Sequence, residues 1–150
     1  MRTVSLVLFC FIYSQILFSQ SFIGTNTTFL GAYGLQQELS VGSQFYKKLH
    51  LDIRVGSNFK SYSTYKFGLR YDLITLTKAK FQVGVDLGHL KYKQFGLQTY
   101  EQFRTFELLA GASYNFYRRI EGVTEIGVMN GQFSTESTSL LMRLGLRYKL

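Results

Sequence analysis

The chemistry that this chain could carry rests on few side chains: two histidines, His50 and His89, and one cysteine, Cys10. His50 stands two positions before Asp52, a setting that favours a hydrogen-bonded interior histidine over a catalytic base. His89 could take part in acyl chemistry only with a serine and an acid beside it, and the sequence places no such partners. Motifs of serine hydrolases, zinc proteases and phosphate-binding loops are absent. We therefore predict no enzymatic activity, no metal site and no cofactor.

The composition indicates one folded domain without disulfides. The 150 residues are 46% hydrophobic, 17% aromatic and 17% charged, with no Pro and no Trp. The charged share is below the roughly 25% usual for soluble domains, and the apolar content excludes disorder. The formal charge is +8, but the basic residues form no contiguous cluster with interleaved aromatics. Nucleic-acid binding is therefore not predicted.

The first 19 residues are typical of a secretory signal peptide. Arg2 precedes an apolar run over residues 4–13, and Ser14 and Gln15 interrupt this run short of the length of a membrane-spanning helix. Cleavage after Ser19 or Ser21 would leave a mature domain over residues 20–150, and an uncleaved anchor is the alternative. Cys10 would leave with the signal, and the bulky residues before it disfavour lipid attachment.

From residue 27 onward the dominant pattern is an alternation of period two. Leu49 to Val55 puts four aliphatic residues on one face and His50, Asp52 and Arg54 on the other, which only an extended strand can do. The same alternation recurs over residues 65–73, 81–88, 106–114, 120–128 and 142–150. Helical periodicity is not visible after the signal peptide, so the domain is predicted to be all-β.

Short and long connections alternate along the chain, as in an up-and-down antiparallel barrel. Seven strands are expected near residues 35–46, 49–60, 64–74, 80–92, 103–117, 119–130 and 138–150. An eighth is needed before Leu35, and Thr27 to Tyr33 is the candidate. The connection over residues 93–102 is the longest clear loop. We predict eight strands.

The face that points inward decides between a membrane barrel and a soluble one. Mid-strand glycines share the polar face with most of the acidic residues, and acids and bases nearly balance there, as in a crowded interior where an unpaired charge would be costly. We therefore predict a charge network that fills the lumen, formed by Glu38, Asp52, Arg54, Lys66, Arg70, Asp72, Asp86, Glu107, Glu121, Glu125, Arg143 and Arg147. The alternative is a secreted lipocalin-like barrel with the faces reversed.

Aromatic residues gather near the expected strand ends, as in the girdles of membrane barrels. One group is Phe45, Tyr46, Tyr71, Phe81, Phe116, Tyr117 and Tyr148, and the other is Phe59, Tyr62, Tyr65, Tyr92 and Phe103. The competing explanation is that Tyr and Phe are simply good strand formers.

The last residues resemble the terminal β-signal of outer-membrane proteins: polar Arg143, then Gly145, aromatic Tyr148 and a final apolar Leu150. Phe is commonest at the final position in that family. The expected domain is thus similar to the small OmpA/OmpX-type eight-stranded barrels of the Gram-negative outer membrane. The resemblance implies an outer-membrane location and recognition of the last strand by the barrel-assembly machinery.

An eight-stranded barrel has room only for its own side chains, so we expect a structural or surface-interaction protein rather than an open pore. Phe95, Leu97 and Tyr100 could bind a partner at the long loop or fold over the rim. Cations on the short turns could meet phosphates of outer-membrane lipids or simply be solvated; they are Lys47, Lys48, Lys78, Lys80, Arg118 and Arg119. An outer-membrane lipid A modifying enzyme that uses His89 is a second alternative to the structural role.

Overall fold

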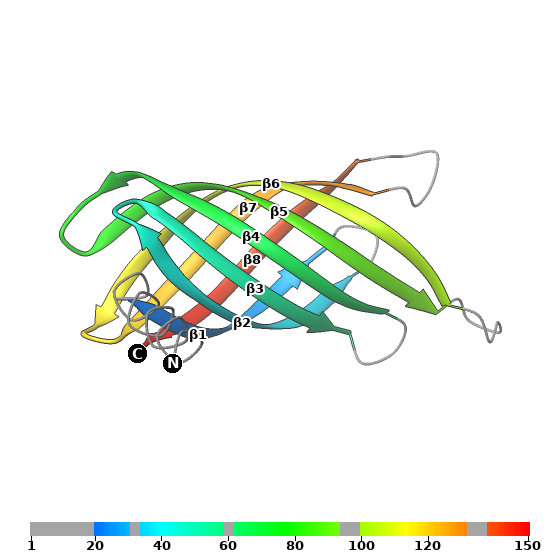
Figure 1. Ribbon diagram of the computed structural model, residues 1–150, viewed down its shortest axis with the longest axis horizontal. Helices are drawn as coiled ribbons and strands as arrows, with labels where there is room; N and C mark the ends of the chain where they lie inside the picture. Colours follow the sequence, from blue (N-terminus) through cyan, green and yellow to red (C-terminus); the bar gives the residue numbers. More distant parts are fainter. Residues whose placement is uncertain (1–19, 31–33, 59–61, 94–99, 132–137) are drawn as a thin grey trace, which may run out of the picture.

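The computed structural model describes residues 20–30, 34–58, 62–93, 100–131 and 138–150, which form eight strands. In chain order these are β1 (Ser21–Phe29), β2 (Leu35–Tyr46), β3 (Leu49–Ser57), β4 (Tyr62–Thr75), β5 (Ala79–Lys93), β6 (Tyr100–Tyr117), β7 (Ile120–Gly131) and β8 (Thr138–Lys149). Each strand pairs antiparallel with the next, and the sheet closes on itself (Figure 1). The predicted all-β barrel of eight strands is confirmed. The predicted signal peptide lies outside the described residues.

Closure is made by β1 and β8, the two strands farthest apart in sequence. Their register runs from Phe22 opposite Lys149 to Phe29 opposite Met142. Because every strand then has two neighbours, the sheet has no open edge, and its backbone N–H and C=O groups are paired within the wall.

The predicted position of the first strand was wrong. It was expected over Thr27 to Tyr33, whereas β1 begins at Ser21 and ends at Phe29. The signal was weak because β1 reverses the usual pattern in places: Phe22 points inward and Thr25 points outward. The other seven strands start and end close to the predicted residues.

Alternation along the strands separates an apolar outer surface from a charged interior. On β3, for example, Ile53 is 61% exposed while the adjacent Arg54 is 1% exposed. The same parity leaves Leu39, Leu87 and Leu144 on the outside. A wall with aliphatic residues outside and charges inside is the arrangement of a barrel immersed in lipid.

The two ends of the barrel differ. Two- and three-residue connections join β2 to β3, β4 to β5 and β6 to β7 at the end where β1 begins and β8 finishes (Figure 1). We call this the turn end. The other four connections leave from the opposite end, the loop end. Each short turn is also held by the strand beside it, since the Lys48, Lys78 and Arg119 carbonyls accept backbone hydrogen bonds of 2.8 Å from Asp72, Asn115 and Lys149.

Inside the barrel, an apolar cluster accompanies the charged residues. It consists of Leu30, Tyr62, Leu90, Leu109, Met129 and Leu141. Tyr62 was predicted to belong to an outer aromatic girdle, but it is buried and points inward. The error arises because proximity to a strand end does not reveal which face a residue occupies. Tyr65, by contrast, is exposed on the outer surface.

We expect Leu51→Arg or Leu69→Arg to reduce the folded fraction far more than Gln82→Arg. Leu51 and Leu69 pair with each other on the outer face, and a charge on the lipid face at the midplane costs about 2 to 4 kcal/mol. Gln82 points inward and donates a hydrogen bond to Asp72, so a cation there would face a carboxylate. Heat-modifiable migration after refolding into vesicles measures the folded fraction. Equal losses at both faces would contradict the assignment.

Candidate functional site: the charged interior

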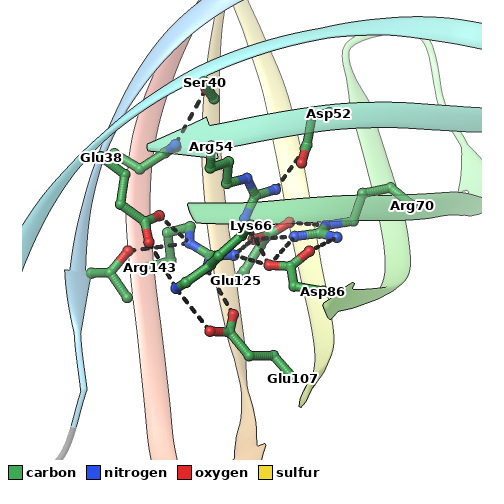
Figure 2. Close-up of polar contacts among 12 residues, drawn as sticks. Glu38, Ser40, Asp52, Arg54, Lys66, Arg70, Asp86, Glu107, Glu125 and Arg143 are labelled. Atoms are coloured by element: carbon green, nitrogen blue, oxygen red, sulfur yellow. Dashed lines mark hydrogen bonds and ion pairs between the residues drawn. The ribbon is translucent and has the colours of Figure 1, made fainter. Parts of the chain in front are cut away.

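Arg143 on β8 is the centre of an ion-pair network that crosses the barrel. Its guanidinium lies 3.0 Å from Glu38 on β2, 3.2 Å from Asp86 on β5, 3.0 Å from Glu107 on β6 and 2.6 Å from Glu125 on β7 (Figure 2). Ion pairs therefore join five strands at one side chain, and a hydrogen bond of 3.2 Å from Arg143 Nε to Thr28 adds β1. The planar fork of arginine suits this role because it presents several donors to different carboxylates at once.

Two further arginines share the carboxylates of Asp86 and Glu125. Arg70 donates to both oxygens of Asp86, at 2.5 and 3.0 Å, and through Nε to Glu125 at 2.6 Å. Arg54 lies 2.7 Å from Asp52, 3.1 Å from Asp86 and 3.4 Å from Glu125. Each carboxylate is thus neutralised by more than one guanidinium, as a dry interior requires.

Lys66 completes the network on the side of Glu38 and Glu107. Its ammonium group lies 2.8 Å from Glu38 and 2.7 Å from Glu107, the carboxylates that Arg143 also contacts (Figure 2). Gln36 donates a hydrogen bond of 2.9 Å to Glu38 and another to Thr64. The amide of Gln36 therefore links the ionic network to neutral polar residues. This link was not predicted from the sequence, because interior residues were identified there by their charge, and an amide is neutral.

A second group of charges lies nearer the turn end. His50 Nε2 is 3.0 Å from Asp72, on the adjacent strand, rather than bonded to Asp52 on its own strand. Asp72 also accepts a hydrogen bond from Gln82 and lies 3.3 Å from the ammonium group of Lys80. Lys80 was predicted only as a turn cation, and its partial burial beside a carboxylate was not foreseen.

Arg147 joins the two groups more loosely. It lies 3.9 Å from both Asp52 and Glu121, and its guanidinium stacks 4.5 Å from the ring centroid of Phe22. Lys149, partly exposed at the turn end, is 3.6 Å from Glu121. The contacts of Arg147 are thus longer than those of the central network, although its side chain is buried.

The structure places all twelve residues of the predicted lumen network inside the barrel, with 0 to 5% exposed surface. They divide into the central network and the turn-end group described above. Seven carboxylates are buried there, and seven Lys and Arg side chains pair with them: Arg54, Lys66, Arg70, Lys80, Arg143, Arg147 and Lys149. The described interior is thus close to neutral.

Gly68 shows why inward glycines accompany these charges. A Cβ added at this position would collide with the carboxylates of Asp52 and Asp86 from the two flanking strands. Gly122 shows the opposite case, on the outer face, where the ring of Phe116 covers the position that a side chain would occupy.

His89 lies outside the network. In the strand register it lies opposite Tyr65 of β4 and Arg104 of β6. Its Nε2 forms a hydrogen bond of 2.9 Å with Gln102. Among the described residues no group of three or more His, Cys, Asp and Glu side chains is arranged to hold a metal ion. The described part of the chain likewise contains no helix long and apolar enough to cross a membrane.

The four residues of the predicted assembly signal extend from the middle of β8, at Arg143, to Leu150, which follows the strand. Arg143 points inward as the centre of the network, and Gly145 follows it on the same face. Tyr148 and Leu150 are exposed on the outer surface. Tyr148 accepts a hydrogen bond of 3.2 Å from Arg119.

The closed wall, the apolar exterior and the ion-paired interior define a transmembrane β-barrel. Solved structures share this fold. The N-terminal β-barrel domain of Pseudomonas aeruginosa OprF superposes with a TM-score of 0.73 at 13% identity, covering 87% of this chain and 97% of that one. A major outer membrane protein from Thermus thermophilus gives 0.65 at 12% identity, with 87% and 99% covered. Neisserial surface protein A gives 0.56 at 17%, with 87% and 95% covered.

No protein-family model matches the sequence. No curated protein matches it either. The likeness to the solved barrels is therefore one of fold.

Replacing Arg143 with methionine should lower the free energy of unfolding by about 3 to 5 kcal/mol, because it leaves buried carboxylates without their partner. Urea titration in detergent micelles measures the change. The control is Arg104→Met, which removes an exposed cation from the outside of β6. Adding Glu125→Gln to Arg143→Met should recover part of the loss. A loss no larger than that of Arg104→Met would show that the network contributes little.

Proposed function

We propose that this chain is an integral outer-membrane β-barrel that acts as a structural or surface-interaction protein and not as an open pore. The observation that carries the proposal is the filled interior, in which Arg143 and its four carboxylates cross the lumen. Eight strands enclose little more space than their own side chains need. A solute would have to displace buried ion pairs in order to pass.

The apolar exterior supports the membrane location. Water-exposed proteins rarely present apolar patches beyond a few hundred Å², whereas here aliphatic and aromatic residues cover the outer wall on every strand. A lipocalin-like barrel would need the reverse arrangement, so the soluble alternative is disfavoured. Short turns on one side and longer loops on the other are typical of outer-membrane barrels, whose turns face the periplasm.

The proposal assigns no enzymatic activity. The lipid A alternative needs a serine and an acid beside His89. The register partners of His89 are Tyr65 and Arg104, and its hydrogen-bond partner is Gln102. None of these three residues is a serine or an acid. We assign binding to surface partners to the loop end. Of the three residues predicted for the long loop, Phe95 and Leu97 lie outside the described residues, and Tyr100 is not in a loop but begins β6.

Fractionation and permeability measurements test this function together. We expect the expressed protein in the outer-membrane fraction, with different gel migration before and after boiling. Liposomes that contain the refolded barrel should swell in sugar solutions no faster than empty liposomes, while a 16-stranded porin provides the positive control. Recovery without detergent would overturn the membrane location, and swelling comparable to that of the porin would overturn the closed interior.

We further propose that the end of β8 is recognised by the barrel-assembly machinery. Tyr148→Ser should lower the amount of folded barrel in cells several-fold, yet leave refolding into vesicles nearly unchanged. Tyr114→Ser is the matched control, since Tyr114 and Tyr148 are 44% and 46% exposed on the outer face. Tyr148→Phe, which loses only the hydroxyl contact with Arg119, should assemble normally. Equal defects in Tyr114→Ser and Tyr148→Ser would show that assembly depends on aromatic residues of the outer girdle in general, and would contradict specific recognition of β8.

A further inference from the structure

Most of the net positive charge of the described barrel lies on its outside, at the turn end. Five cations are exposed on the three short turns: Lys47, Lys48, Lys78, Arg118 and Arg119. The described side chains of Asp and Glu are all buried in the interior, so none of them is exposed beside these cations. The described side chains exposed at the turn end therefore carry a net positive charge.

The outer wall is hollowed next to two of these turns. The residues that line the hollow include Ala112 and Phe116 on β6, Thr124 on β7, and Leu144 and Leu146 on β8. Ala112 and Thr124 lie opposite each other in the register, as do Thr124 and Leu144. The hollow thus extends across β6, β7 and β8 on the outer face of the barrel.

Lys78, Arg118 and Arg119 lie at the turn-end limit of this hollow. Lys78 directly precedes Ala79, which lines the hollow, and its carbonyl is fixed by Asn115 of β6 at 2.8 Å. The Arg119 carbonyl is fixed by Lys149 of β8 at 2.8 Å, and its side chain donates to Tyr148. Both turns therefore have defined backbone positions beside the hollow.

We propose that this hollow and its three cations bind one anionic phospholipid of the surrounding leaflet, with an acyl chain against Ala112 and Thr124 and the phosphate at Lys78, Arg118 and Arg119. The apolar hollow matches the acyl chain of such a lipid, and the exposed cations at its turn-end limit match the phosphate. The exposed rings of Tyr114 and Tyr148 lie at this end of the wall, as aromatic residues do at membrane interfaces. The inference rests on the membrane location proposed above.

Native mass spectrometry of the refolded barrel in micelles, with phosphatidylglycerol or phosphatidylcholine of identical chains added, tests the site. The wild type should retain one phosphatidylglycerol in preference to phosphatidylcholine. Arg118→Gln with Arg119→Gln should reduce that retention by at least about fivefold, since each basic residue near an anionic headgroup contributes measurably. Lys47→Gln with Lys48→Gln removes the same charge from another turn and should leave the retention unchanged.

A second pair of variants tests the hollow. Ala112→Leu adds bulk to the lining of the hollow without changing charge and should also reduce retention. Ala110→Leu, two residues along the same outer face and outside the lining, should not. Inorganic phosphate at the same concentration should not displace the lipid, because it cannot occupy the hollow. Heat-modifiable migration of every variant shows separately that the barrel is intact.

Three outcomes would overturn the inference. Equal losses in the two charge variants would indicate general electrostatic attraction at the turn end. Displacement by inorganic phosphate would indicate an ion site without an acyl part. Dimers of the wild type that disappear in Ala112→Leu would show that a second copy of the chain covers the hollow.

Discussion

The pairing of β1 with β8 is the constraint on which the rest of the structure depends. Once the eight strands close, every second side chain must fit into a narrow interior, and every other one must face outward. The sequence meets the first demand with glycines beside long charged residues, as at Gly68 between Asp52 and Asp86. It meets the second with aliphatic and aromatic residues, which suit a lipid environment and no other.

The period-two pattern made most of this fold predictable. Alternation indicates seven strands and divides their residues between two faces, because a strand allows only two orientations for each residue. The antiparallel order follows from the alternating connection lengths, and the inward face from the glycines and balanced charges on it. The first strand was misplaced because its inward Phe22 and outward Thr25 interrupt the alternation of polar and apolar residues near its start. Tyr62 was assigned to the wrong face for a related reason: an aromatic residue near a strand end suits either a girdle or an interior cluster, and only the register decides.

The site was predictable in its membership but not in its contacts. Parity places a charged residue inside, whereas its partner depends on the stagger between strands and on side chains from across the barrel. His50 therefore pairs with Asp72 and not with the nearer Asp52 in sequence, and Arg143 meets Glu38 from a strand 105 positions earlier. Lys80 joins the interior from a position next to a turn, where burial cannot be read from charge alone.

The interior and the outer wall differ in how freely their residues can be exchanged in evolution. Inside, several cations share the carboxylates of Glu38, Asp86, Glu107 and Glu125, whereas outside the residues are mostly apolar. A substitution at Arg143 affects five other strands at once, so interior positions can change only through compensated steps at several sites. Outward positions need only remain apolar, and most exchanges among aliphatic residues there are nearly neutral. Descendants of such a barrel would lose resemblance fastest on the wall, while coordinated charge exchanges inside would preserve the architecture long after the sequences had diverged.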